Sequence, residues 1–106
     1  MSDETTHNAQ IERISLGLED HGILTSYISC VFESSGQGFG GFDLRSGNAC
    51  ATFVLGVQRA VGVSDWSDLK NKYCRIKRQG GMIVAIGHIV EDRWFTKEDI
   101  FKEGFK

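Results

Sequence analysis

Residues 14–32 have the sequence ISLGLEDHGILTSYISCVF, and this stretch decides the fold. Before its centre the apolar side chains of Ile14, Leu16 and Leu18 recur at every second position, which is the period of a half-buried β-strand. The centre, residues 19–22, consists of turn-forming residues and ends in a glycine. The sequence therefore predicts a long antiparallel hairpin, and one face of its second strand is expected to carry Leu24, Ser26, Ile28, Cys30 and Phe32.

The composition indicates one soluble domain. A chain of 106 residues, 41% hydrophobic and 25% charged, suffices for a single modest core. Residues 1–9 show no apolar period and are expected to form a mobile tail, which leaves residues 10–106 as the domain. No apolar run approaches the length of a membrane span, the start of the chain does not resemble a secretory signal, and three widely spaced cysteines disfavour a disulfide framework. We therefore expect a cytoplasmic protein without membrane contact.

After the hairpin comes a glycine cluster, SSGQGFGGF at residues 34–42. Four glycines within six residues surround Phe39, and such clusters are typical of tightly turning loops. The spacing does not match a phosphate-binding loop. We predict an irregular loop that presents Phe39, followed by a short third strand over residues 41–45.

The period changes to that of a helix over residues 49–61. Asn48 is the expected N-cap, Gly62 the expected C-terminal glycine, and Gly56 is expected to mark a close contact with the sheet. A single helical turn, capped by Ser64 or Asp65, is predicted at residues 64–69.

Two further strands are predicted at residues 73–78 and 82–90, joined by a turn at 79–81. The second is almost continuously apolar, so we expect it at the centre of the sheet. A short C-terminal helix is expected to begin at the cap Thr96, with Asp99 at the third position after the cap as in a capping box, and to be anchored by Ile100, Phe101 and Phe105. The predicted fold class is α+β: a twisted antiparallel sheet of four to five strands, with one main helix packed on it and a short C-terminal helix.

Residues suited to binding outnumber residues suited to catalysis. Large aromatic side chains beside arginine are typical anchors of protein interfaces, and charged patches of both signs can dock a partner of complementary charge. The predicted partner-binding residues are the aromatic and arginine candidates Phe39, Phe42, Arg93 and Trp94, the basic residues Lys72, Arg75 and Lys77 of a segment with five positive charges in nine residues, and the acidic pair Glu19 and Asp20. The net charge of −2 makes nucleic acid an unlikely partner.

Four segments carry a resemblance to a known group of proteins: LGLEDHGILT at 16–25, GQGFGGF at 36–42, VGVSDW at 61–66 and IGHIVEDRWF at 86–95. Together they resemble a family of small, mostly uncharacterised proteins encoded by bacteriophages and prophages. The resemblance implies a phage context and supplies no catalytic residue. Members often have a longer insertion after the glycine cluster, where this chain has only Asp43-Leu44-Arg45-Ser46-Gly47.

Small acidic phage proteins without catalytic motifs often inhibit host machinery, as anti-CRISPR proteins do. The expected function is therefore non-catalytic inhibition of a bacterial defence complex by direct protein binding in the host cytoplasm, without a cofactor. A homodimer is left open.

Two alternatives stay open. In the first, an oligomer sequesters a small signalling nucleotide, with Gly36, Gly38 and Gly40 against the phosphates, Arg45 as counter-charge and Phe39 stacked on the base. In the second, the chain binds a metal ion through histidine, cysteine or carboxylate ligands, the candidates being His21, His88 and Cys74. The sequence lacks the closely spaced ligand pairs of a typical zinc site.

Overall fold

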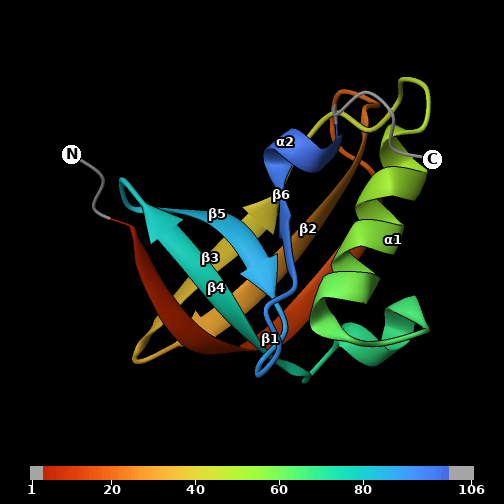
Figure 1. The fold of residues 1–106 in the computed structure, drawn as a ribbon. Coiled ribbons are helices and arrows are strands. Elements are labelled where there is room, and N and C mark those ends of the chain that lie inside the picture. The colour runs from red at the N-terminus through yellow and green to blue at the C-terminus, as the bar shows by residue number, and fades with distance from the viewer. Residues whose placement is uncertain (1–3, 101–106) are drawn as a thin grey trace.

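The computed structural model describes residues 4–100 and contains one antiparallel sheet and one main helix (Figure 1). The strands are β1 (Thr5–Leu18), β2 (Leu24–Phe32), β3 (Ser35–Gly40), β4 (Tyr73–Gln79), β5 (Met82–Gly87) and β6 (Trp94–Thr96). The helices are α1 (Ala49–Val61), the 3₁₀ turn η1 (Trp66–Leu69) and the short α2 (Lys97–Ile100). The α+β class, the main helix and the short last helix are confirmed, but the sheet has six strands where four or five were predicted.

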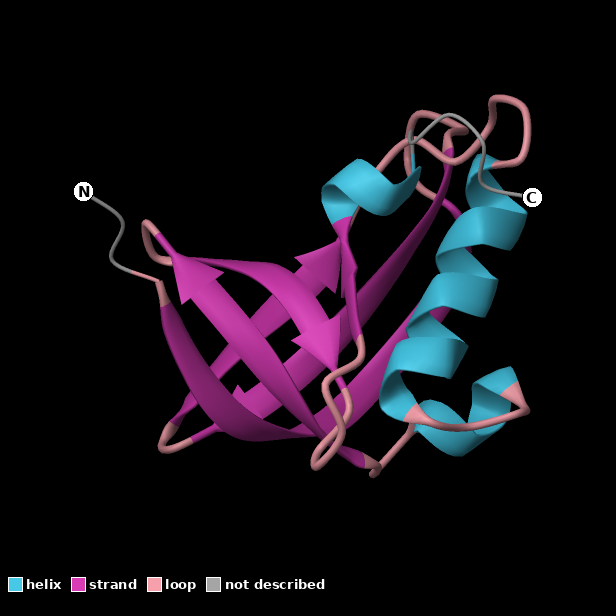
Figure 2. Ribbon diagram, in the orientation of Figure 1, coloured by secondary structure: helices cyan, strands magenta, loops and turns pink. Residues whose placement is uncertain are grey.

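The strand order is β3-β2-β1-β4-β5-β6. The sheet curls so far that β3 comes into contact with β5, although three strands separate them in the order (Figure 2). A side-chain hydrogen bond from Gln37 to the Gly81 carbonyl joins β3 to the turn between β4 and β5. α1 packs against β5 and β6, and the interior lies between this helix and the concave face of the sheet.

The predicted hairpin is present as β1 and β2, paired from Leu18 opposite Leu24 to Gln10 opposite Val31. The expected inner face of β2 is confirmed, because Ser26, Ile28, Cys30 and Phe32 are buried and Leu24 is half-buried. β1 differs from the prediction at its end, where Leu16 and Leu18 remain 44% and 74% exposed.

The predicted N-terminal tail is too long, because β1 already begins at Thr5. Residues 5–10 pair with β4, from Thr5 opposite Arg78 to Gln10 opposite Tyr73. Their side chains are mostly polar and exposed, so they show no apolar period, and their pairing partner lies more than sixty residues away in the sequence. Residues 1–3 lie outside the described residues.

The glycine cluster is a strand, which corrects the predicted loop. β3 pairs with β2 from Phe32 opposite Ser35 to Tyr27 opposite Gly40. A Cβ at Gly38 would lie 2.0 Å from the Tyr27 ring, so this glycine makes room for a neighbouring tyrosine to lie across the strand. Residues 41–45, predicted as a strand, form no regular element.

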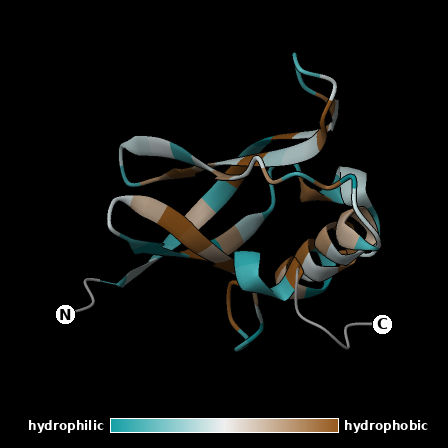
Figure 3. Ribbon diagram, turned by 90° about the horizontal axis from the view of Figure 1, so that it is seen from above, coloured by the Kyte–Doolittle hydropathy of each residue, from teal (hydrophilic) through white to brown (hydrophobic). Residues whose placement is uncertain are grey.

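The main helix has the predicted bounds, and Gly62 ends it with a φ of 98°. Asn48 precedes it but makes no side-chain capping hydrogen bond. The predicted close contact at Gly56 is confirmed, since a Cβ there would lie 2.2 Å from the Phe95 ring on β6. In Figure 3 this helix is mostly brown to pale, and its buried residues recur at helical spacing, as packing on one side requires: Ala49, Thr52, Phe53, Val57, Ala60 and Val61.

The last third of the chain departs from the prediction in one strand. β5 ends at Gly87 and lies next to the last strand, while β1 and β4 occupy the centre of the sheet. Both predicted caps are present: Asp65 accepts from the Ser67 N–H at 2.9 Å, and Asp99 accepts from the Thr96 N–H at 2.9 Å. Phe101 and Phe105 lie outside the described residues. Within residues 4–100, no helix has the length and apolar character that crossing a membrane would require.

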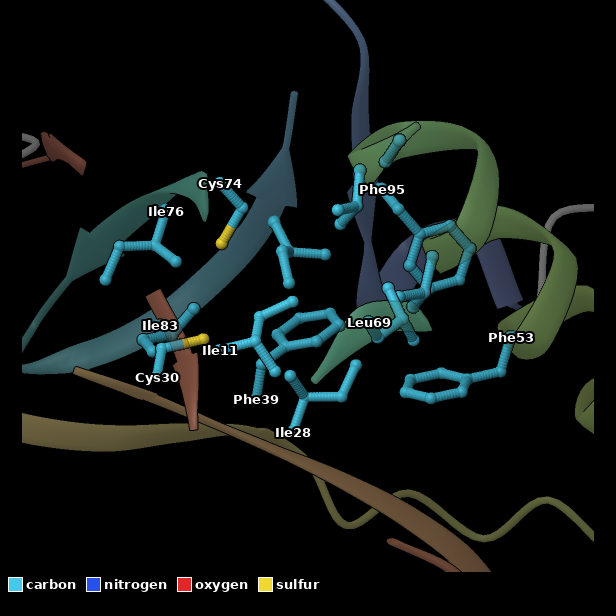
Figure 4. Close-up of a cluster of buried hydrophobic side chains, with 14 of the residues drawn as sticks. Ile11, Ile28, Cys30, Phe39, Phe53, Leu69, Cys74, Ile76, Ile83 and Phe95 are labelled. Atoms are coloured by element: carbon cyan, nitrogen blue, oxygen red, sulfur yellow. The ribbon is translucent and has the colours of Figure 1, made fainter. Parts of the chain in front are cut away.

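Aromatic rings form the centre of the core (Figure 4). Phe39 and Phe53 stack with their ring centroids 6.1 Å apart, and Phe95 meets the Phe53 ring edge to face at 5.7 Å. Phe39 was predicted to be exposed or covered by a partner, but it is 1% exposed. The alternation of β3 turns this side chain inward between two glycines, so the expectation that it lies on a loop was wrong.

We predict that Phe39→Ala lowers the free energy of unfolding by about 3–5 kcal/mol, because it leaves a cavity among packed rings. Urea denaturation followed by circular dichroism measures the effect. Val90→Ala is the control, since Val90 is 77% exposed and its truncation should change stability by less than about 0.5 kcal/mol. Equal stability of the Phe39→Ala variant and the native protein would contradict this core.

Candidate functional site

An indole ring beneath two cations forms the most organised surface feature, here named the Trp94 cluster and defined as Trp94, Arg75 and Lys77. Arg75 of β4, Gly87 of β5 and Trp94 of β6 lie in one row across the sheet. A Cβ at Gly87 would lie 2.5 Å from the Trp94 ring, so the indole crosses β5 at this glycine and extends towards β4. The Arg75 guanidinium carbon lies 5.0 Å and the Lys77 ammonium 4.2 Å from the ring centroid.

Hydrogen bonds hold the Trp94 cluster in place. The Arg75 side chain donates from Nε to the His88 carbonyl and from Nη2 to the Glu91 carbonyl, both at 2.7 Å. The indole N–H of Trp94 donates to Asp92 Oδ1 at 2.8 Å. Each cation-π contact contributes about 0.5–1 kcal/mol at an exposed site, and the bonds to the loop at residues 88–93 add rigidity. The indole and the guanidinium are therefore ordered before any partner arrives.

His88 has a structural role in this loop. Its Nδ1 accepts the backbone N–H groups of Val90 at 3.0 Å and Glu91 at 2.9 Å. A Cβ at Gly62 would lie 3.1 Å from the other ring nitrogen, which places the imidazole against the end of α1. Accepting two N–H groups requires a lone pair on Nδ1, so the proton of the neutral ring is on Nε2.

A groove of about 370 Å³ lies next to the Trp94 cluster, between α1 and β6. Apolar atoms of Gly56, Ala60 and Phe95 line it together with Trp94, and charged side chains add Arg59, Arg93 and Asp99. Arg93 Nε is 3.1 Å from Glu91 Oε1 and its side chain is 45% exposed. The lining thus combines apolar residues with the basic residues Arg59 and Arg93, of which Arg93 is paired with Glu91.

Sequence reasoning missed Arg59. A basic residue in the last turn of a helix already has an explanation in the helix dipole, so the sequence alone draws no attention to it. Only the packing of α1 beside β6 brings it to the same groove as Arg93 and Trp94.

The basic segment of residues 70–78 does not form one surface. Arg75 and Lys77 reach Trp94, but the next residue of β4, Arg78, points to the opposite face of the sheet, where its guanidinium lies 5.3 Å from the centroid of the Phe32 ring. Lys72 is exposed and precedes β4, where its backbone carbonyl accepts from the Ile11 N–H. The structure thus brings two of the three predicted basic residues to the predicted Trp94.

Phe42 belongs to the margin of the core. It is half-buried, its ring meets Phe39 edge to face at 5.6 Å, and the Lys97 ammonium lies 5.7 Å from its centroid. Arg75 and Lys77 contact the Trp94 ring, whereas the cation at the Phe42 ring is Lys97, so the structure does not bring Phe42 into the Trp94 cluster.

The acidic pair lies at the tip of the β1–β2 hairpin. Glu19 accepts the backbone N–H groups of His21 and Ile23 and contacts the His21 ring at 3.2 Å. Desolvation raises the pKa of the Glu19 carboxyl, but the hydrogen bonds from Ile23 and His21 outweigh it, so this pKa lies below its ordinary value. Glu19 therefore stabilises the turn, while Asp20 is exposed.

The nucleotide site of the first alternative is not formed as predicted. Gly36, Gly38 and Gly40 belong to β3, and the buried Phe39 cannot stack on a base. Arg45 binds the Asp43 carboxylate through Nη2 at 2.8 Å and Nε at 3.0 Å. These hydrogen bonds lower the pKa of Asp43 to about 2, so the charge of Arg45 is already paired.

The candidate metal ligands lie apart. The Cys74 thiol hydrogen-bonds to Cys30, and both sulfur atoms point into the core (Figure 4). This hydrogen bond and burial raise the pKa of Cys74, which keeps the thiol protonated. The His21 side chain is 84% exposed and His88 is engaged in its loop. Across residues 4–100 no three histidine, cysteine or acidic side chains gather as a metal site would need.

Comparison with protein-family models gives no match for this chain, and comparison with curated proteins gives no significant match.

Gly87→Ala should displace the indole of Trp94, because the added Cβ would lie 2.5 Å from the ring and 2.7 Å from the Arg93 carbonyl. We expect a loss of about 1–3 kcal/mol in stability and a shift in tryptophan fluorescence. Gly17→Ala is the matched control, since a Cβ added at Gly17, which lies on β1, would meet nothing within 4 Å. An unchanged emission spectrum in Gly87→Ala would contradict the described position of the indole.

An NMR pH titration of the Asp43 carboxyl should give a midpoint near 2, and Arg45→Gln should move it towards the ordinary 3.8. Because the folded-state pKa lies below the unfolded value, the pair stabilises the fold above pH 3.8 and loses this contribution as the pH falls towards 2. The effect on stability is small since both groups are about half exposed. A native midpoint near 4 would show that Arg45 is free to bind another anion.

Proposed function

We propose that this protein is a non-catalytic binding protein that docks an acidic surface of a partner protein on the Trp94 cluster and the adjoining groove. The observation that carries the proposal is the Trp94 indole, held across Gly87 with Arg75 and Lys77 at its ring. In keeping with the resemblance to phage proteins, the proposed partner belongs to a bacterial defence complex.

The chemistry of the Trp94 cluster supports a protein partner. Tryptophan and arginine are the side chains that most often dominate binding energy at protein interfaces. Here the indole N–H and the Arg75 guanidinium are already hydrogen-bonded within the chain, so binding orders few additional groups. The groove adds Arg59 as a further basic residue for a partner's carboxylates, while Arg93 is paired with Glu91.

The surrounding charges support a protein over a nucleic acid. The carboxylates of Glu91 and Asp92 lie in the same loop and contact Arg93 and Trp94. A phosphate backbone approaching the cations would meet these carboxylates, whereas an acidic protein patch can be shaped to avoid them. The overall charge of −2 also disfavours binding to the negatively charged backbone of a nucleic acid.

The states of the reactive side chains support a non-catalytic role. The Cys74 thiol is buried and hydrogen-bonded to another cysteine, which leaves it neither ionised nor accessible. The His88 Nδ1 lone pair is occupied by two backbone N–H groups, so it is poorly placed to accept a proton from a substrate.

An affinity pull-down from a bacterial host lysate, followed by binding measurements with the recovered protein, tests the proposal. Trp94→Ala should weaken binding by about 2 kcal/mol or more, about 30-fold in Kd, and Lys77→Glu should weaken it by reversing a charge. Lys70→Glu is the matched control, because Lys70 is exposed and lies outside the Trp94 cluster.

Circular dichroism of each variant separates loss of binding from loss of folding. Native affinity in the Trp94→Ala variant, or an equal loss in Lys70→Glu, would refute the assigned surface. A partner that is not part of a defence system would refute the phage context while leaving the surface in place.

A further inference from the structure

The second half of β1 is paired on one side only. β4 covers β1 up to Ile11, where the Asn71 N–H donates to the Ile11 carbonyl at 2.7 Å. A register shift at Glu12 follows, and among residues 4–100 the remainder of the strand pairs with β2 alone. Figure 1 shows β1, red to orange, continuing past β4 towards the turn at the top of the view. We name residues 13–18 the free β1 edge.

The hydrogen-bonding pattern between β1 and β2 shows which backbone groups of the free β1 edge are available to bind another strand. The Glu19 N–H donates to the Ile23 carbonyl at 3.0 Å, and hydrogen-bonded pairs alternate with non-hydrogen-bonded pairs in an antiparallel hairpin. The N–H and C=O groups of Ile14, Leu16 and Leu18 therefore point away from β2. They offer a strand-long row of donors and acceptors to another strand.

Three of the six residues along the free β1 edge, Ile14, Leu16 and Leu18, have apolar side chains. Leu16 is 44% and Leu18 is 74% exposed, on the side of the strand that carries the partly buried Ile14. A hollow of about 260 Å³ runs along the same segment, lined by Ser15 to Glu19 and Thr25. Unpaired apolar strand edges invite pairing with a further strand, and residues 14–18 of this edge contain neither a charged residue nor a proline, the features that commonly prevent it.

We propose that the free β1 edge pairs antiparallel with the same edge of a second copy of this chain, with the two-fold axis at Leu16. Pairing requires residues whose backbone groups point outward to face each other, and an axis at Leu16 meets this requirement by placing Ile14 opposite Leu18 and Leu16 opposite itself. In this register Arg13 of each copy faces Glu19 of the other, so two pairs of opposite charge flank the axis. Moving the axis to Ser15 would instead set Glu12 opposite Leu18 and lose both charge pairs.

The dimer uses a different part of the molecule from the Trp94 cluster. Residues 13–19 of β1 and its turn take no part in the contacts of Trp94, Arg75 or Lys77. The proposal therefore stands independently of the proposed function, and a dimer would present the Trp94 cluster twice.

Sedimentation equilibrium of the native chain and two lysine variants tests the pairing. The native chain should be a dimer, and Leu16→Lys should raise the dimer dissociation constant at least about tenfold, because two ammonium groups would meet at the axis. Leu55→Lys is the matched control, since Leu55 on α1 is 41% exposed and should leave the dimer intact. A monomeric native chain, or equal dimerisation of native and Leu16→Lys, would overturn the proposal.

Disulfide trapping tests the register independently. In a hydrogen-bonded antiparallel pair the Cα atoms are about 5.5 Å apart, within the range of a disulfide, so Leu16→Cys should cross-link to itself under mild oxidation. Ser15→Cys should not, because Ser15 would face Gly17 and its own copy would be more than about 7 Å away. Both variants are compared in a Cys50→Ser background. Cys50 is half-buried and could react, whereas the other two native cysteines, Cys30 and Cys74, are buried. Cross-linking of Ser15→Cys as fast as Leu16→Cys would overturn the register.

Discussion

Contact between aromatic rings and glycine backbone is the interaction on which the arrangement of this protein depends. Phe95 lies against Gly56 and thereby sets how closely α1 approaches the sheet. Tyr27 lies across Gly38, and Trp94 lies across Gly87. In each case a side chain as small as a methyl group would occupy the volume of the ring, so the glycines act mainly by leaving space.

The same interaction joins the core to the candidate site. Phe95 and Trp94 are neighbours on β6 and point to opposite faces of the sheet, one into the ring cluster with Phe53 and the other outward towards Arg75. The core thus fixes the strand that presents the indole. A surface held in this way is suited to recognition, because the anchor side chain keeps one position before and after binding.

Two surfaces of different character result. The Trp94 cluster and its groove combine an aromatic ring with guanidinium and ammonium groups, whereas the free β1 edge combines backbone hydrogen-bonding groups with exposed leucines. The first suits an acidic partner and the second suits another strand. Their separation on the sheet lets one chain pair with a copy of itself while still presenting the indole.

The sequence by itself determined the elements whose evidence is local. The period-two pattern predicted the hairpin, the helical period predicted α1 with Gly62 at its end, and the spacing of Thr96 and Asp99 predicted the last cap. It also suggested Trp94, Arg75 and Lys77 as candidate binding residues, which remains a prediction, but it did not show that the two cations contact the Trp94 ring. The hairpin, helix and cap predictions succeed because neighbouring residues supply the determining interactions.

Only the tertiary structure decided the features that depend on distant residues. Thr5 to Ala9 form a strand because β4 pairs with them, and Phe39 is buried because β3 pairs with β2 and turns the ring towards Phe53. Arg59 joins the groove because α1 packs beside β6. Long-range pairing and packing determine which side of a strand faces the core. The composition of a short glycine-rich segment therefore does not predict which of its side chains are buried.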